Sequence, residues 1–270
     1  MSDKSIQSVA ILGGGNLGRA LATGWTASGL FQPADVHLTR RHADKLADLG
    51  EQGFVVGSDN GAAAAKADVV VVAVQPGQIK EVLDEIAPVL QADRHAVISV
   101  ATGVTLATLR EHLGNEVPIV RAMPNTAVGT QNSMTCLSAD HDDARSLEAA
   151  QQLFDAVGLT MIIDEEMMIP ATALCACGIA FFLRTIRAAA QGGTEIGFHA
   201  DDALMLAAQT ARGAADLVLR GVSHPEGEID RVTTPRGCTI AGLNEMEHQG
   251  FSSAMIRGIL TSSRRAEELM

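Results

Sequence analysis

The sequence predicts an α/β protein, in which an N-terminal doubly wound parallel sheet is followed by an all-helical C-terminal domain. Up to about residue 164, short β-branched and aliphatic runs alternate with segments of helical periodicity, as in βα units packed into a parallel sheet. Beyond residue 164 the alternation stops and nearly every segment has helical periodicity. We therefore expect one domain over residues 1–164 and a second over residues 165–270.

Composition limits the classes of function. The 270 residues are 47% hydrophobic and 19% charged, enough for a substantial core, and the net charge of −12 argues against a general surface for nucleic acid or anionic membranes. The four cysteines do not have the spacing of a disulfide framework, and the N-terminus does not resemble a secretion signal. No apolar run reaches the about 18 residues that a membrane span needs. We expect a cytoplasmic protein with reduced thiols that binds neither nucleic acid nor membranes.

The first expected strand, residues 8–12, ends in a glycine-rich loop that opens a helical pattern reaching residue 29. This order of strand, G-x-G-x-x-G loop and helix is typical of dinucleotide binding. Gly13 permits the tight turn, Gly15 lets the backbone approach the pyrophosphate, and Gly18 lets the helix pack on the strand. The alternative is a plain connection between strand and helix. The cofactor-binding candidates in the loop are Gly13, Gly15, Asn16, Leu17 and Gly18.

The second expected strand, residues 36–39, ends in a basic pair. Folds that prefer NAD usually place a carboxylate there, on the ribose 2′-hydroxyl. Here Thr39 is followed by Arg40 and Arg41, whose guanidiniums suit a 2′-phosphate. The pattern favours NADPH as cofactor, with NADH possible, and the three residues are candidates for binding it. The alternative is an exposed basic pair in a loop.

Further strands and helices continue the alternation. Ligands of such sheets sit beyond the carboxyl ends of the strands, so the polar and proline residues that follow the strands should face the cofactor. For Asn125 the alternative is a turn-capping role. The expected strands cover residues 53–56, 68–74, 96–100, 118–126 and 160–163, and the expected helices 62–67, 78–90, 106–113 and 140–157. The cofactor-binding candidates here are Asn60, Ala73, Val74, Gln75, Pro76 and Asn125.

The C-terminal part should be helical over residues 165–174, 178–192 and 201–222, and from 239 onward. Several of these segments are apolar nearly all round, which requires burial on more than one face. We therefore expect an intertwined homodimer, with the size of any higher oligomer open. The alternative is that the helices pack only against the sheet domain.

Residues 232–243 form a hydroxyl-rich proline–glycine turn that runs directly into a helical pattern. Such a turn directs free N–H groups and hydroxyls at one point and favours a small anion. Because the N-terminal loop already serves the phosphates, we expect this anion to be a substrate carboxylate. The sequence has no Tyr, and Lys80 is its last lysine, so the turn must orient a substrate that is already reactive.

The motifs Met123-Pro124-Asn125-Thr126 and Thr234-Pro235-Arg236-Gly237-Cys238-Thr239 carry a specific likeness. With them the chain resembles the pyrroline-5-carboxylate reductase family over essentially its whole length. The resemblance implies a Rossmann-type NADP-binding domain, a helical dimerisation domain, and reduction of the ring C=N of 1-pyrroline-5-carboxylate to L-proline with NADPH or NADH. It also implies that the late turn holds the substrate carboxylate and that the Thr239 hydroxyl lies near the imine nitrogen. The resulting candidates are Thr234 and Thr239 as catalytic residues, and Cys175, Cys177, Gly178, Arg236, Gly237 and Cys238 as substrate-binding residues.

The chain also departs from the family pattern. Residues 175–181 read Cys-Ala-Cys-Gly-Ile-Ala-Phe where the family usually has Ser-Gly-Ser-Gly-Pro-Ala-Tyr. Arg236 stands where the family usually has glycine, and Gln75 where it usually has lysine. These departures leave the exact substrate open.

Several alternatives follow. Another cyclic imine acid, such as a piperideine carboxylate, would keep the chemistry, and a catalytically impaired NADPH-binding regulator would keep only the cofactor. A β-hydroxyacid dehydrogenase needs a lysine in its second domain and a short-chain dehydrogenase needs a tyrosine; this chain has neither. Zinc on Cys175, Cys177 and Cys238 is a further alternative. We favour small thiols that line the core, hence no metal. A further hypothesis is sensitivity to oxidants through Cys238, and the sequence leaves it open whether the cysteines have this effect.

Overall fold

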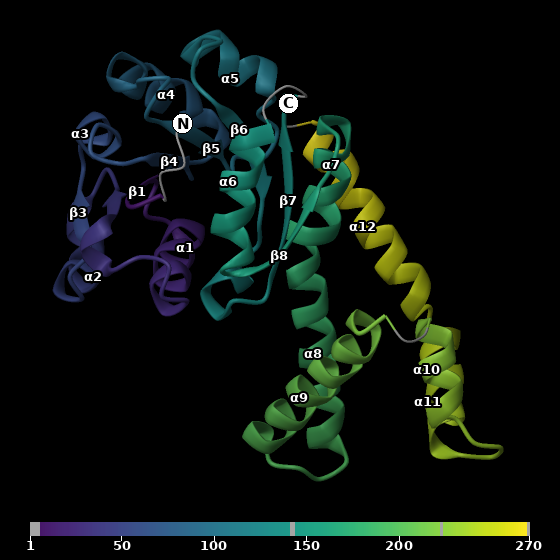
Figure 1. Ribbon diagram of the computed structural model, residues 1–270. Helices are drawn as coiled ribbons and strands as arrows, with labels where there is room; N and C mark the ends of the chain where they lie inside the picture. The colour runs from purple at the N-terminus through teal and green to yellow at the C-terminus, as the bar shows by residue number, and fades with distance from the viewer. Residues whose placement is uncertain (1–5, 141–143, 222–223, 269–270) are drawn as a thin grey trace. The chain divides into compact units, whose positions relative to one another are not determined.

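The computed structural model describes residues 6–140, 144–221 and 224–268 (Figure 1). The chain divides into two compact units, one of Met1–Cys177 with Ser262–Met270 and the other of Gly178–Thr261. Residues 165–177 therefore fold with the sheet-containing unit. The domain boundary expected at residue 164 stays a prediction.

The first unit is built on an eight-stranded sheet of order β3-β2-β1-β4-β5-β6-β7-β8. Strands β1 to β6 are all parallel, which confirms the doubly wound sheet. Strand β7 runs antiparallel to β6, and β8 is parallel to β7. The strands are β1 (Val9–Leu12), β2 (Val36–Thr39), β3 (Val55–Gly57), β4 (Val69–Val72), β5 (Ala96–Ser99), β6 (Ile119–Met123), β7 (Ser133–Ala139) and β8 (Gly158–Ile162).

The central strands are apolar throughout because both faces of the sheet are covered. Successive side chains of a strand point to opposite faces. Val9 and Ile11 of β1 join one core with Trp25 and Phe154, whereas Ala10 joins a second core with residues of the helices on the other face. The helices of this unit are α1 (Asn16–Ala27), α2 (Ala47–Glu51), α3 (Asn60–Ala64), α4 (Ile79–Ile86), α5 (Leu106–Leu113), α6 (Ala144–Asp155) and α7 (Met168–Ala171).

Trp25, the only tryptophan of the chain, connects α1 to α6. Its side chain is fully buried, and its Nε1 donates a hydrogen bond of 2.7 Å to the Leu153 carbonyl. Phe31 and Phe154 meet its ring edge-on, with centroids 6.2 and 5.8 Å away. This cluster holds the helix that follows the glycine loop.

Strand β7 is the strand that the sequence analysis missed, and the helices at residues 47–51 and 225–232 were not expected either. Its run Ser-Met-Thr-Cys-Leu-Ser-Ala shows no clean alternation of polar and apolar residues over its whole length. The hydroxyl residues Ser133, Thr135 and Ser138 are nevertheless all buried. Hydroxyl pairing makes this burial possible: Ser133 Oγ lies 3.3 Å from Thr135 Oγ1 and accepts a bond from the Asn125 N–H. Of the helix expected over 140–157, residues 141–143 lie outside the described part of the chain.

The second unit is helical, as expected. Helices α8 and α9 pack closely on each other, and a side chain at Gly193 would lie 3.1 Å from the Ala203 side chain. Val222, where we expected α9 to end, lies outside the described residues. The helices are α8 (Gly178–Glu195), α9 (Ala200–Leu219), α10 (Pro225–Val232), α11 (Cys238–His248) and α12 (Phe251–Glu267), of which α12 ends in the first unit.

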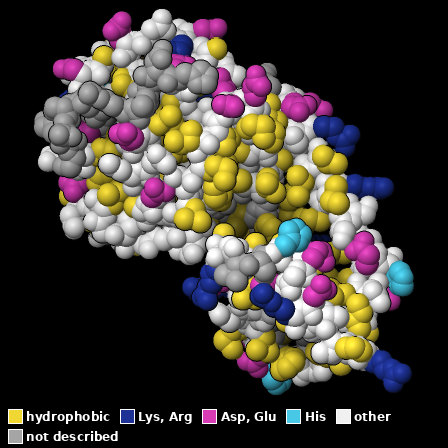
Figure 2. Space-filling model, turned by 45° about the vertical axis from the view of Figure 1, so that its right-hand side comes forward, with side chains coloured by type: hydrophobic (Ala, Val, Ile, Leu, Met, Phe, Trp, Pro, Cys, Tyr) yellow, Lys and Arg dark blue, Asp and Glu magenta, His cyan; other side chains and the backbone are white. Residues whose placement is uncertain are grey.

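Large apolar side chains of this unit remain exposed in the single chain. Ile196 is 79% exposed, and Phe182, Met205 and Leu219 are exposed as well. Figure 2 shows hydrophobic side chains gathered in patches on the surface of the molecule. Such patches on a protein surface mark interaction sites, so the helices are not covered by their own chain alone.

The expectation that the protein binds no membrane rested on uninterrupted apolar runs alone, and one helical stretch passes a broader test of length and composition. The helical stretch Glu165–Glu195 is long and apolar enough, by length and composition, to cross a membrane. The sequence analysis considered only uninterrupted apolar runs, and this stretch contains isolated polar residues. Length and composition alone do not place a helix in a bilayer, because core helices of globular proteins pass the same test.

Candidate active site

The glycine loop lies directly against the ends of two neighbouring strands. The N–H groups of Gly13 and Gly14 both donate to the Thr39 carbonyl, at 3.1 and 2.7 Å. Gly13 has φ +115°, and a side chain there would meet the Ala73 carbonyl oxygen at 2.4 Å. A side chain at Gly18 would meet the Gly13 carbonyl oxygen at 2.2 Å. Gly13 and Gly18 are therefore needed for packing.

Gly15 differs from these two glycines because a side chain on it would meet no atom within 4 Å. It precedes α1 with ordinary extended angles, φ −81° and ψ −166°, and no side chain caps the helix. The first N–H groups of a helix have no intrahelical acceptor. This end of α1 is thus open on one side, as a site for a pyrophosphate requires.

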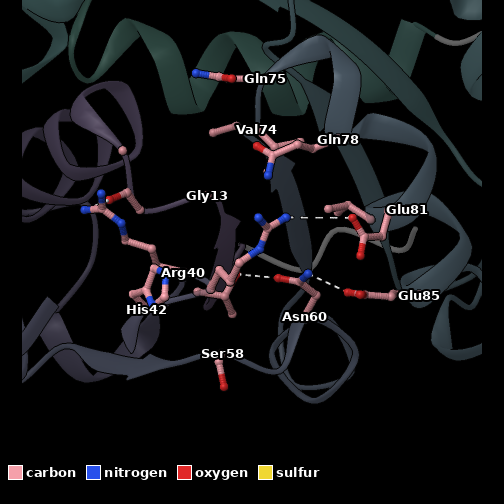
Figure 3. A pocket seen from close by; sticks show the side chains of 16 residues that line it. Gly13, Arg40, His42, Ser58, Asn60, Val74, Gln75, Gln78, Glu81 and Glu85 are labelled. Atoms are coloured by element: carbon pink, nitrogen blue, oxygen red, sulfur yellow. Dashed lines mark hydrogen bonds and ion pairs between the residues drawn. The ribbon is translucent and has the colours of Figure 1, made fainter. Parts of the chain in front are cut away.

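A cavity opens beside the loop (Figure 3). Nine predicted cofactor residues line it: Gly13, Gly15, Thr39, Arg40, Arg41, Asn60, Ala73, Val74 and Gln75. The lining does not include Asn16, Leu17, Gly18, Pro76 or Asn125. It does include seven residues that sequence reasoning missed: Gly14, His42, Ser58, Gln78, Glu81, Val82 and Glu85. Contact between any of these residues and a cofactor stays a prediction.

The cavity carries opposite charges on its two sides. Figure 3 shows Arg40 and His42 on one side and Glu81 and Glu85 on the other. Arg40 Nη1 donates to the Gly14 carbonyl at 3.2 Å, which holds this guanidinium at the loop. The more exposed Arg41 lies 3.9 Å from a Glu81 carboxylate oxygen. The basic pair therefore belongs to the wall of the cavity.

Asn60 connects the two sides. Its Oδ1 accepts a bond of 2.6 Å from the Thr39 hydroxyl, and its Nδ2 donates to Glu85 at 2.6 Å. Thr39 itself is buried at the end of β2. This chain of side chains fixes the end of β2 against α4. An acidic residue on a helix gives no local sequence signal of facing a cavity, which explains why Glu81 and Glu85 were missed.

Asn125 has the capping role that the sequence analysis gave as the alternative. Its Oδ1 accepts from the Ala127 N–H at 2.9 Å, at the start of the short helical turn Thr126–Thr130. Its Nδ2 donates to the Cys175 carbonyl at 3.2 Å. Both ends of the amide are therefore engaged within the protein.

The predicted substrate segment around Cys175 begins in an unusual turn. Residues Thr172–Ala176 form a π-helical turn, in which the Cys177 N–H bonds to the Thr172 carbonyl at 2.9 Å, and α8 begins at Gly178. Turns of this kind are frequent at functional sites. Cys175 and Cys177 are both half-buried.

Cys136 of β7, which sequence reasoning did not single out, contacts this segment. Its Sγ lies 3.9 Å from Cys175 Sγ. A hydrogen bond between the thiols raises the pKa of Cys136, because the Cys136 proton is shared with its neighbour and burial disfavours a charge there. The same bond lowers the pKa of Cys175 to about 7.

The late turn, Thr234 to Gly237, is a tight reversal closed by a 2.9 Å bond from the Gly237 N–H to the Thr234 carbonyl. Pro235 is followed by Arg236 at φ +61°, the pattern of a type II turn, in which glycine is the usual third residue. A side chain at Gly237 would lie 2.5 Å from Thr234 Oγ1. Arg236 thus holds a left-handed conformation that disfavours residues with a β-carbon.

Gly237 also precedes α11, with extended angles and no side-chain cap. The Gly237 N–H is used within the turn, so it is not free for an anion, contrary to what the sequence led us to expect. The first-turn N–H groups of Cys238 and Thr239 remain without intrahelical acceptors. The structure places Thr234, Arg236 and Gly237 in one local turn, and Cys238 and Thr239 are the first two residues of the helix that follows it.

Within residues 6–140, 144–221 and 224–268, no three His, Cys, Asp or Glu side chains cluster in a way that could hold a metal ion. Cys238 is exposed.

The glycine loop, the basic end of β2 and the cavity between them define the class: an oxidoreductase with a dinucleotide-binding domain. A family model described as "NADP oxidoreductase coenzyme F420-dependent" matches residues 8–103. A second, described as "Pyrroline-5-carboxylate reductase dimerisation", matches residues 165–269. The chain belongs to the pyrroline-5-carboxylate reductase family, on the similarities that follow.

Two proteins of Dictyostelium discoideum are similar to the whole chain. Pyrroline-5-carboxylate reductase 1 is 50% identical over 97% of this chain, although the chain spans only 49% of that protein's length. Pyrroline-5-carboxylate reductase 2 is 47% identical, over 98% of this chain and 94% of that protein. The crystal structure of a Plasmodium falciparum pyrroline carboxylate reductase with NADP bound has a TM-score of 0.88 over 98% of both chains. At 22% identity, this likeness shows the fold.

The different surroundings of Gly13 and Gly15 lead to a testable contrast. Gly15→Ala should change the free energy of unfolding by less than about 1 kcal/mol, because the angles suit alanine and only a weak helix-cap preference is lost. It should weaken NADPH binding by roughly tenfold or more, since the added methyl group stands where the backbone approaches the pyrophosphate. Gly13→Ala should instead destabilise the fold by roughly 1–3 kcal/mol or more, through its left-handed φ and the clash with Ala73.

Thermal unfolding and fluorescence titration with NADPH measure the two effects. Gly13→Ala serves as the matched control, because it adds the same methyl group two residues away. Normal NADPH affinity in Gly15→Ala would contradict the assignment of the loop.

Proposed function

We propose that the protein reduces the ring C=N bond of 1-pyrroline-5-carboxylate to L-proline with NADPH, the last step of proline synthesis. The observation that carries this proposal is the 47% identity to a pyrroline-5-carboxylate reductase across 94% of that protein's length. The glycine loop with its cavity and the late turn at the start of α11 supply the two kinds of binding element that the reaction needs. NAD(P)H, when bound, supplies the hydride.

The residues of the cavity support a preference for NADPH. No carboxylate ends β2, whereas Arg40 and Arg41 line the cavity next to Thr39. Glu81 and Glu85 lie opposite, but Glu81 faces Arg41 and Glu85 accepts from Asn60. We infer that Arg40, held at the loop, and Arg41, which is free to turn from Glu81, bind the 2′-phosphate. The remaining predicted cofactor residues, Asn16, Leu17, Gly18, Pro76 and Asn125, support the loop and the strand ends that shape the cavity.

We infer that the turn preceding α11 holds the substrate carboxylate. The N–H groups of Cys238 and Thr239 and the hydroxyl of Thr234 provide donors, and the N-terminal end of a helix favours negative charge. Arg236 adds a cation beside them. Gly237 closes the turn, and the segment of Cys175, Cys177 and Gly178 supplies the rest of the substrate-binding surface in this proposal.

The chemistry needs no strong acid from the protein. A protonated cyclic imine is already electrophilic, so the main task of the chain is to orient the ring carbon for hydride transfer. The sequence contains no tyrosine and no lysine beyond Lys80, which fits this mechanism. We assign the Thr239 hydroxyl to a hydrogen bond with the imine nitrogen.

We further propose that residues 165–270 form a dimerisation domain of a cytoplasmic homo-oligomer. The dimerisation model that matches residues 165–269 supports this proposal. So do the exposed apolar side chains of α8, α9 and α12, among them Phe182, Met205 and Ile256. A second copy of the chain is the proposed partner, because its helices expose the same apolar side chains and the two copies can bury them against each other.

A panel of cyclic imine acids tests the reaction. The purified protein should oxidise NADPH fastest with 1-pyrroline-5-carboxylate. The six-membered piperideine carboxylate should be worse by roughly 10–200-fold in kcat/KM, the usual effect of one methylene in a fitted pocket. Loss of NADPH absorbance with each substrate is the measurement. Preference for the six-membered ring would identify a different imine reductase, and NADPH binding without turnover would identify a regulator.

Removing both guanidiniums tests the cofactor preference. Arg40→Ala with Arg41→Ala should raise KM for NADPH by roughly 10–100-fold, the usual range for lost hydrogen bonds to a charged group, and should change KM for NADH far less. Arg19→Ala is the matched control, because Arg19 pairs with Asp48 and does not line the cavity. An unchanged ratio of NADPH to NADH use would refute the assignment.

Two substitutions at Thr239 test its hydroxyl. Thr239→Val keeps the shape but removes the hydrogen-bonding group, and should lower kcat/KM about tenfold or more, within the range for a lost bond at a reacting centre. Thr239→Ser keeps the hydroxyl and should retain most of the activity. Activity that is kept in Thr239→Val and lost in Thr239→Ser would show that the methyl group, not the hydroxyl, matters.

A further inference from the structure

Cys136 and Cys175 form a pair of thiols that the proposed reaction does not use. They are 39 residues apart in the sequence, yet their Sγ atoms are 3.9 Å apart. Neither residue lines the cofactor cavity. Cys136 is buried in β7, whereas Cys175 is half-buried in the π-helical turn.

The fold brings the two thiols together from both sides of a small apolar core. The antiparallel pairing of β6 and β7 places Cys136 opposite Met123. Met123, Cys136, Met168 and Ala171 form this core, and Cys175 packs against it. The contact therefore depends on rigid elements: one thiol is in the sheet and the other in the turn that covers it.

The two thiols have different chemical roles available to them. The two thiols are within hydrogen-bonding distance of each other, and this contact lowers the pKa of Cys175, which favours the thiolate form there. Cys175 is also the more exposed of the two, so a small oxidant in solvent reaches it first. Cys136 is buried and in contact with Cys175, which is the position that a resolving cysteine must occupy in order to form a disulfide with an oxidised partner.

We propose that Cys136 and Cys175 form a site of reversible oxidation by peroxide. The Cys175 thiolate attacks one peroxide oxygen, the O–O bond breaks, and the departing hydroxide takes a proton to become water, leaving a sulfenic acid. The Cys136 sulfur then attacks the Cys175 sulfur, its proton and the sulfenic hydroxyl leave as a second water, and a disulfide forms. The two thiols lose two electrons, and the peroxide gains them. The sulfurs must close from 3.9 Å to about 2.05 Å, a movement of roughly 2 Å.

The disulfide should change the segment that follows. The Cys175 carbonyl accepts the bond from Asn125, and Cys175 and Cys177 lead into α8. Drawing Cys175 toward β7 disturbs this bond and the turn together. Because we assign this segment to substrate binding, the effect on activity rests on the proposed function, whereas formation of the disulfide does not.

Mass spectrometry tests the disulfide directly. The folded protein is treated with hydrogen peroxide, alkylated, and digested with trypsin without reduction. Trypsin leaves Cys175 and Cys177 on one peptide, residues 146–184, so the Cys177→Ser variant is digested in parallel. We expect this peptide to be linked to residues 122–145, which contain Cys136, in both proteins. Dithiothreitol should release it.

Activity tests the consequence. Diamide, which oxidises thiols to disulfides, should lower the rate of NADPH oxidation by about tenfold to a hundredfold, the effect of misplacing a reacting group by about 1 Å, and dithiothreitol should restore the rate. Cys136→Ser should keep its untreated activity and lose the response. Cys238→Ser, compared with its own untreated rate, should keep the response.

The outcomes separate the two proposals. Absence of the linked peptide in folded, peroxide-treated protein would overturn the oxidation site, whatever the substrate proves to be. A linked peptide with unchanged turnover would overturn its effect on activity, and so would inhibition that persists in Cys136→Ser. If Cys136→Ser does not fold by circular dichroism, Cys136→Ala takes its place.

Discussion

The cofactor cavity depends on one close approach between backbones. The loop after β1 passes so near the end of β4 that no side chain fits at Gly13, and its two N–H bonds attach it to the end of β2. Three neighbouring strands therefore end at one point. The basic residues after β2 and the residues after β4 are brought to the loop as a consequence, and only a parallel order of these strands permits it.

The two proposed anion sites share one physical plan. Helices α1 and α11 both begin after a glycine in extended conformation, Gly15 and Gly237, and neither has a side-chain cap. Ser, Thr, Asp and Asn are preferred at this position because their side chains accept hydrogen bonds from the first N–H groups. Leaving the cap without a side chain keeps these donors available for a ligand. The cofactor phosphates and the substrate carboxylate would then be held by the same backbone chemistry at separate helices.

Features that depend on neighbours in the sequence were predictable, and features that depend on distant pairing were not. Apolar strands such as β1 and β4 were recognised because burial on both faces leaves continuous aliphatic runs. Strand β7 was missed because three of its hydroxyl side chains are buried, with the Ser133 and Thr135 hydroxyls paired with each other. Glu81 and Glu85 reach the cavity only through the packing of α4, and Cys136 reaches Cys175 only through the β6–β7 pairing. The resemblance to the family pointed to the late turn as a binding site. The sequence could not show that the Gly237 N–H bonds to the Thr234 carbonyl within that turn.

The backbone at Arg236 bears on how this protein could be altered. A left-handed φ disfavours a residue with a β-carbon by roughly 1–2 kcal/mol, so this arginine lowers the stability of its own turn. The effect of a substitution at this position therefore depends first on whether the new residue can adopt a positive φ. Glycine and asparagine can do so, whereas β-branched residues cannot without strain. An attempt to move the guanidinium into a related enzyme would carry the same conformational penalty with it. A substitution at position 236 therefore changes the charge beside the turn and the stability of the turn at the same time.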